Sequence, residues 1–169
     1  RFHVPRSVAA AIAEVGSAEA CLELLENSGT EIAPFSIDRI VERFGRLDVL
    51  VNAAAIWKRK RLEDVTADDV REHFDVNTLG TFLCSKHAGL QMVRQPEGGA
   101  IVNLGDWATR RPYNDYAAYF PSKGAIPAMT RMFAVELSQR NPKVRVNAVL
   151  PGPVMLPAHL SESERSQAI

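Results

Sequence analysis

The sequence predicts a doubly wound α/β fold built on a parallel sheet. Three short runs rich in aliphatic residues, at positions 47–51, 100–104 and 144–150, are typical of strands in such a sheet. Long helical patterns lie between them, at residues 66–93 and 119–139. Strands that alternate with helices form parallel βαβ units with right-handed crossovers. We therefore expect a parallel sheet with helices packed against it.

Length and composition fit one ordinary globular domain. The chain has 169 residues, 46% hydrophobic and 24% charged, which excludes disordered, collagen-like and low-complexity proteins. Lys plus Arg (20) equals Asp plus Glu (20), so the basic excess of a nucleic-acid-binding protein is missing. Apolar stretches are too short to span a bilayer, and two cysteines, Cys21 and Cys84, make neither a disulfide framework nor a metal site. We expect a cytoplasmic protein that binds no nucleic acid, membrane or metal.

The segment before the first clear strand has weaker patterns. Residues 7–27 look helical with one break, and residues 30–35 fit a strand. Residues 37–44 fit a short helix, and Gly45 after it is typical of a helix C-cap.

The two long helical patterns carry signals at defined positions. Thr66 is a good N-cap, and Asp68 and Asp69 in the first turn complement the helix dipole. In the second pattern Pro121 fits a first turn. Pro127 lies in the interior, where it should remove a hydrogen bond and kink the helix.

The candidate ligand site lies at the carboxyl ends of the predicted strands, where open parallel sheets bind ligands. Here these positions are residues 52–57, 105–107 and 151–153. Tyr119 and Lys123, four residues apart, share one face of the following helix. A lysine ammonium near a phenol lowers the tyrosine pKa and makes the phenol a usable acid or base. On its own, this spacing is more often a solvated helix face.

In combination, the motifs resemble those of the short-chain dehydrogenase/reductase family. Asn52 and three alanines follow the first strand, Asn77 lies in the next helix, and the tyrosine–lysine pair follows Asp106 at the family's spacing. The segments 145–147 (Arg-Val-Asn) and 151–153 (Pro-Gly-Pro) complete the order. The resemblance implies a Rossmann-like nucleotide-binding domain that transfers hydride with a nicotinamide cofactor.

The resemblance also implies roles for the matching residues in the middle of the chain. Tyr119 matches the catalytic acid. Lys123 matches the lysine that lowers the pKa of that tyrosine and holds the nicotinamide ribose. Asn77 matches the asparagine that holds a water molecule in the proton relay.

Two further segments match the family's cofactor contacts. Asn52 and Ala53 correspond to the segment that lies against the cofactor. Pro151, Gly152 and Val154 correspond to the loop that covers the nicotinamide.

The match is incomplete at both ends of the sequence. His3 and Ser7 resemble the end of the second family strand, which receives the 2′-phosphate of NADP. NADP(H) is therefore preferred to NAD(H), although a frayed basic terminus explains these residues equally well. The family's glycine-rich Thr-Gly-x-x-x-Gly-x-Gly turn and its final strand have no counterpart here. We expect residues 1–169 to form a single dinucleotide-binding domain that lacks segments at both ends.

Asp106 stands where the family usually has a serine. An ionised aspartate only accepts hydrogen bonds, so it cannot simply replace a hydroxyl that binds a carbonyl substrate. Pteridine and dihydromonapterin reductases carry aspartate here, and resemblance to them implies reduction of a pterin C=N bond, with Asp106 and Tyr119 delivering the proton. Trp57 falls where that subgroup has an aromatic residue stacked on the pterin, with core packing as its alternative. Trp107 is expected to be a packing or loop residue.

Two other functions stay open at this point. The chain could be a carbonyl or alcohol oxidoreductase for another small substrate, or a non-catalytic binding protein that has lost the serine. The resemblance further implies a homotetramer assembled through the helices that contain Asn77 and Tyr119.

Overall fold

The computed structural model describes residues 32–152, of which residues 32–36 are described by their backbone alone. The predicted cofactor residues His3, Ser7 and Val154 lie outside the described residues, as does the helix expected at 7–27.

Three parallel strands form the sheet, in the order β1-β2-β3. They are β1 (Val49–Asn52), β2 (Gly99–Leu104) and β3 (Val144–Val149). Leu50 lies opposite Ile101 in the register of the first pair. The prediction of a Rossmann-like α/β fold with a parallel sheet is confirmed.

A continuous helical stretch leads from β1 towards β2. It consists of α3 (Ala67–His73), the π-helical segment η3 (Phe74–Gly80) and α4 (Thr81–Val93). The short 3-10 helix η2 (Leu62–Asp64) precedes it. The long helix predicted over residues 66–93 is confirmed, with a π-helical middle that the sequence pattern did not reveal.

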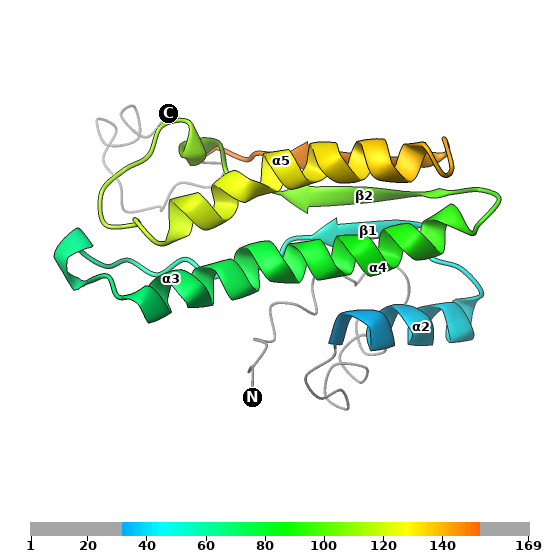
Figure 1. Ribbon diagram of the computed structural model, residues 1–169, viewed down its shortest axis with the longest axis horizontal. Helices are drawn as coiled ribbons and strands as arrows, with labels where there is room; N and C mark the ends of the chain where they lie inside the picture. The colour runs from blue at the N-terminus through cyan, green and yellow to red at the C-terminus, as the bar shows by residue number, and fades with distance from the viewer. Residues whose placement is uncertain (1–31, 153–169) are drawn as a thin grey trace, which may run out of the picture.

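The remaining helices pack with α4 in one layer. The connection from β2 to β3 contains η4 (Trp107–Thr109) and α5 (Tyr119–Ser138), and α2 (Ile32–Phe44) precedes β1. α2 packs on α4, α4 packs on α5, and α4 and α5 contact the strands (Figure 1). Successive right-handed crossovers in the same direction place their helices on the same face of a sheet. Among residues 32–152 no helix combines the length and apolar character needed to cross a membrane.

The core fills the space between this helix layer and the sheet. Leu50 and Ile101 project from the covered face of the strands and are almost completely buried. On the opposite face Val51 and Val102 are only partly buried, and Arg145 is exposed. The helices contribute these members of the core cluster: Ile37, Ile40, Ala88, Met92, Ile126, Met129, Phe133 and Leu137. Burial of this apolar surface is the main favourable contribution to folding.

The helix ends follow the predicted capping chemistry. Thr66 Oγ1 accepts the N–H of Asp69 at 3.2 Å, and the Asp69 carboxylate accepts the N–H of Thr66 at 2.7 Å. The carboxylate also accepts from Lys60 Nζ at 2.6 Å, and these hydrogen bonds lower the pKa of Asp69. Gly45, with φ 78°, ends α2 by donating its N–H to Val41 O at 2.8 Å.

The strand expected at residues 30–35 is wrong from Ile32 onwards, where the backbone already belongs to α2. Ile37, Ile40 and Val41 recur at helical spacing, and they pack against the core, so the helix is stabilised by tertiary contacts. Pro34 is compatible with this helix because a first turn needs no N–H from it.

α5 runs through Pro127 as a single helix, and the kink expected there stays a prediction. The proline lacks the N–H that would donate to the carbonyl oxygen of Lys123. The neighbouring Ile126 and Met129 are buried in the core, so packing holds the helix across the missing hydrogen bond.

Candidate active site

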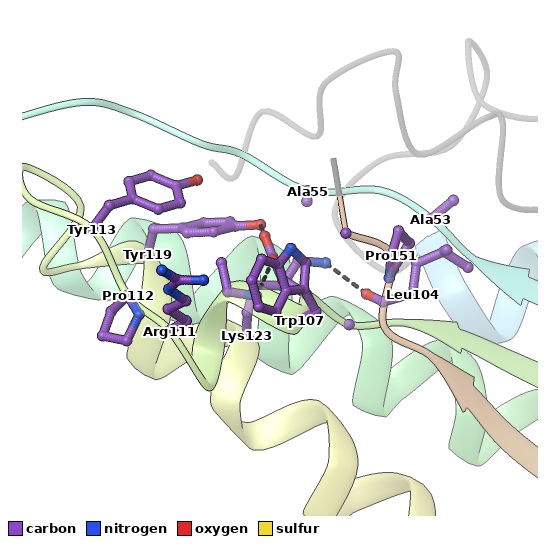
Figure 2. A pocket seen from close by; sticks show the side chains of 14 residues that line it. Ala53, Ala55, Leu104, Trp107, Arg111, Pro112, Tyr113, Tyr119, Lys123 and Pro151 are labelled. Atoms are coloured by element: carbon purple, nitrogen blue, oxygen red, sulfur yellow. Dashed lines mark hydrogen bonds between the residues drawn. The ribbon is translucent and has the colours of Figure 1, made fainter. Parts of the chain in front are cut away.

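A cavity of about 770 Å³ lies at the carboxyl ends of the strands. All three segments that follow the strands contribute to its wall, as the fold class predicted, and α5 adds Tyr119 and Lys123 (Figure 2). The post-strand residues in the wall include Ala53, Ala55, Gly105, Asp106, Trp107, Pro151 and Gly152.

Tyr119 and Asp106 meet in this cavity. The Tyr119 hydroxyl donates a hydrogen bond of 2.7 Å to Oδ2 of Asp106 (Figure 2). Oδ1 of the same carboxylate accepts the N–H of Ala108 at 2.8 Å, so Asp106 is also the N-cap of η4. Because both oxygens are engaged, the carboxylate is held in a fixed orientation against the phenol.

The surroundings raise the pKa of Tyr119 above its ordinary value. Burial contributes most, because it disfavours the charged phenolate, and the hydrogen bond to Asp106 adds to the effect. For the described residues this direction contradicts the lowered pKa that was expected from Lys123, whose Nζ donates to Leu104 O at 2.7 Å. In this environment Tyr119 is a protonated hydrogen-bond donor.

The ammonium group of Lys123 lies buried in the cavity wall. Burial lowers the pKa of Lys123, and the carboxylate of Asp106 opposes this shift. An ammonium group has three N–H donors, and among the described residues Leu104 O takes one. Two donors remain for a bound molecule.

Asn77 is completely buried in η3 and connects two parts of the site. Its Oδ1 accepts the N–H of Ile56 at 2.8 Å, and its Nδ2 donates to Ile56 O at 3.0 Å and Ser122 Oγ at 2.9 Å. Ser122 Oγ donates in turn to Tyr119 O at 2.6 Å. Asn77 thus ties the segment after β1 to the start of α5. Its part in a proton relay stays a prediction.

The side chain of Asn52 belongs to a buried polar network rather than to the cavity wall. Its Nδ2 donates to Ser85 Oγ at 2.9 Å and to Asn103 Oδ1 at 2.8 Å. Asn103 Nδ2 continues the network to Thr130 Oγ1 at 3.0 Å. Of the two residues expected against the cofactor, Ala53 therefore lines the cavity, and Asn52 links β1 to β2 beside it.

Pro151 and Gly152 line the cavity together with Trp107. The N–H of Trp107 donates to Pro151 O at 3.3 Å. A Cβ atom at Gly152 would lie 3.0 Å from Nε1 of Trp107, so a larger residue there would press on the indole ring. Trp107, expected only as a packing or loop residue, is thus part of the cavity wall. Its position directly after Asp106 was the sequence feature that could have indicated this role.

Trp57 stacks on Tyr116 instead of facing the cavity. The ring centroids are 5.1 Å apart with an interplanar angle of 12°, and Trp57 is 59% exposed. The residues that line the cavity do not include Trp57 and take their aromatic rings from Trp107, Tyr113 and Tyr119. Its role as a stacking partner for substrate stays a prediction.

Two further polar side chains line the cavity without having been singled out from the sequence. Arg111 and Tyr113 belong to the loop between η4 and α5. Applying the strand-end rule to the whole loop after β2, rather than to its first three residues, selects both.

Comparisons with known proteins agree with this geometry. A family model described as "Enoyl-(Acyl carrier protein) reductase" matches residues 6–168. A "Short-chain dehydrogenase/reductase" of Armillaria gallica is 37% identical over 153 residues, 90% of this chain and 58% of its own. The chain spans about half the length of the curated relatives it matches.

Solved structures of similar proteins share the fold. The structure of ElxO with NADP bound is 34% identical, with a TM-score of 0.66, over 72% of this chain and 48% of that one. Acetoin dehydrogenase from Enterobacter cloacae is 39% identical, with a TM-score of 0.68, over 78% of this chain and 53% of that one. The sheet is parallel, the site lies at its carboxyl edge, and the family model spans residues 6–168. The chain therefore belongs to the short-chain dehydrogenase/reductase family.

Proposed function

We propose that this protein is an NADP(H)-dependent oxidoreductase that reduces a C=N bond of a flat, pterin-like heterocycle. The observation that carries the proposal is the hydrogen bond of 2.7 Å between Tyr119 Oη and the Asp106 carboxylate in the cavity. Each oxygen of this carboxylate has a second lone pair beyond its bond to Ala108 or Tyr119, so Asp106 can also accept from substrate N–H groups beside the reacting bond.

The two side chains divide the proton chemistry between them. Tyr119, kept protonated by its raised pKa, donates a proton to the ring nitrogen, and Asp106 orients the phenol. An imine nitrogen is more basic than a carbonyl oxygen, so it takes a proton more readily from so weak an acid. When bound, the nicotinamide supplies the hydride for the neighbouring carbon.

The cavity wall fits the nicotinamide end of the cofactor. Ala53, Gly105 and Gly152 place little side-chain bulk at the strand ends. The two remaining N–H donors of Lys123 suit the hydroxyl groups of a ribose. The NADP bound to the similar protein ElxO supports the choice of NADP(H).

Reduction of a small carbonyl compound is the second candidate. The similarity to acetoin dehydrogenase from Enterobacter cloacae favours a substrate of this class. The stacking of Trp57 on Tyr116 also covers one face of the ring that was expected to hold a pterin.

NADPH consumption by the full-length protein separates the two candidates. It would be measured with a dihydropterin and with diacetyl, for the wild type, Asp106→Ser and the surface control Asp68→Ser. The Asp68 side chain is 90% exposed, so its loss should leave both rates unchanged. We expect Asp106→Ser to lower dihydropterin turnover by about a hundredfold, because the proton donor Tyr119 loses the carboxylate that orients it.

The carbonyl candidate predicts the opposite pattern. Diacetyl would then be the better substrate, and Asp106→Ser would keep or increase that activity, because serine restores a donor to the carbonyl oxygen. A wild type that neither binds NADPH nor consumes it would contradict both candidates and favour a binding protein.

A further inference from the structure

We infer that Arg111 is a specificity-determining residue that binds a carboxylate group of the substrate. This inference rests on the proposed function, because it assigns the class of substrate to the same cavity. Arg111 lines that cavity together with Tyr119 and Asp106, and it carries the one guanidinium group among the described residues of the wall. Figure 2 shows its side chain on the same wall as Tyr119 and Trp107.

The backbone at Arg111 is held in place by η4. Its N–H donates to Ala108 O at 3.0 Å, and the N–H of Ala108 is itself capped by Asp106 at 2.8 Å. Pro112 follows and restricts the backbone on the other side. The carboxylate that orients Tyr119 therefore also fixes the turn from which the Arg111 side chain extends.

The guanidinium of Arg111 has no carboxylate partner within residues 32–152. Arg59 and Arg71 differ in this respect, since each pairs with an aspartate at 2.7 Å. Asp106, the acidic residue among the described residues of the wall, accepts from Ala108 and Tyr119 and forms no ion pair with Arg111. Within the described part of the chain, Arg111 therefore keeps its charge and its N–H donors at the cavity.

The charges of the wall favour an anionic ligand. Among the wall residues that the structure describes, Arg111 and Lys123 carry positive charge against the single carboxylate of Asp106. A guanidinium is a planar fork that binds a carboxylate through two parallel hydrogen bonds. Trp107 and Tyr113 line the same cavity with flat rings. The combination suits a planar substrate that bears a carboxylate.

Binding of matched ligands tests this inference without requiring turnover. Calorimetry would give dissociation constants of pterin carboxylate against hydroxymethylpterin, and of pyruvate against hydroxyacetone. In each pair a carboxylate replaces a hydroxymethyl group. The full-length protein would be titrated with and without NADP⁺, as wild type, Arg111→Gln, Arg111→Lys and Arg110→Gln. Arg110 is exposed and does not line the cavity, so it is the matched control.

We expect the carboxylate of at least one pair to bind the wild type and Arg110→Gln about tenfold or more tightly than its neutral partner, as charged hydrogen bonds allow. Arg111→Gln should abolish this preference, and Arg111→Lys should retain part of it, because lysine keeps the charge but not the fork. The inference would be overturned if the two ligands of each pair bound with equal affinity, or if neither carboxylate bound. It would also be overturned if the preference for the carboxylate survived in Arg111→Gln.

Two further readouts separate the possible failures. If Arg111→Gln weakens the binding of NADP⁺ and leaves the carboxylate preference within each ligand pair unchanged, the arginine binds a cofactor phosphate and the inference is wrong. If the carboxylate preference depends on Arg111 while NADPH is neither bound nor consumed, the inference stands and the proposed function fails.

Discussion

Asp106 serves two purposes in this molecule. One oxygen caps η4 through Ala108, and the other accepts the hydroxyl of Tyr119. A substitution at Asp106 will therefore change both the loop after β2 and the acidity of Tyr119. These effects can be separated, because asparagine keeps the capping oxygen for Ala108 and replaces the charged oxygen that accepts from Tyr119 with an NH₂ group.

We predict that Asp106→Asn shifts the pH dependence of catalysis to lower pH. The carboxylate raises the pKa of Tyr119, so its removal lowers that pKa, although burial continues to raise it. Oxidation of the reduced product needs Tyr119 as a deprotonated base, so its rate should rise at lower pH in the variant. The measurement is kcat for oxidation as a function of pH, for Asp106→Asn, the wild type and the surface control Asp68→Asn. An unshifted profile, or a shift to higher pH, would show that the carboxylate does not control the phenol.

We predict that Tyr119→Phe removes turnover and leaves cofactor binding intact. The variant lacks the hydroxyl that donates to Asp106, while Lys123 keeps its bond to Leu104. Loss of a positioned general acid should lower kcat by about 10²- to 10⁴-fold. Stopped-flow measurement of hydride transfer and titration with NADP⁺ check the two parts. A variant with near wild-type turnover would exclude Tyr119 as the proton donor.

At the residue scale, the sequence predicted which groups meet but not how they titrate. The strand-end rule placed Asp106 at the site, and the spacing and family resemblance added Tyr119 and Lys123 from the following helix; all three line one cavity. The pKa of Tyr119 moves upwards because burial outweighs any cation, and burial depends on the finished fold. The direction of Lys123 Nζ likewise depends on a carbonyl oxygen, Leu104 O, whose position only the fold determines.

At the scale of elements, η3 determines where Asn77 lies. A π-helical turn between α3 and α4 holds this buried side chain against Ile56 and Ser122. π-Helical segments are often found at functional sites. The aliphatic strands and the capped helices were predictable because burial pattern and capping chemistry are local. The π-helical turn and the extension of α2 to Ile32 were not, because tertiary packing decides both.

Two glycines in neighbouring helices should respond oppositely to alanine. A Cβ at Gly124 in α5 meets nothing within 4 Å, whereas one at Gly89 in α4 would overlap the buried side chain of Leu137. We predict that Gly124→Ala raises the free energy of unfolding by about 0.5–1 kcal/mol, through helix propensity. Gly89→Ala should lower it by about 1–3 kcal/mol, through overpacking. Urea denaturation measures both, and equal effects at the two sites would contradict this account of the α4–α5 contact.

At the scale of the whole molecule, the helix layer is covered by the sheet on one side only. Its other side carries large apolar side chains that remain exposed in the single chain. Met132 and Val135 of α5 are 40% and 58% exposed, and Leu79 of η3 is 47% exposed. Met132 and Val135 are three residues apart and therefore share one face of α5. Exposed apolar patches on a folded domain commonly mark interfaces with other chains.

We therefore predict that the full-length protein associates through the helices that carry Asn77 and Tyr119, as a homotetramer. Val135→Asp places a charge in the proposed interface and should lower the mass seen by sedimentation velocity, because burying an unpaired carboxylate is costly. Leu62→Asp is the control, because Leu62 in η2 is 72% exposed but lies outside the helices α4 and α5. Circular dichroism would verify that both variants remain folded. A wild type that sediments as a monomer, or a Val135→Asp variant with unchanged mass, would mean that this apolar face is not where the copies meet.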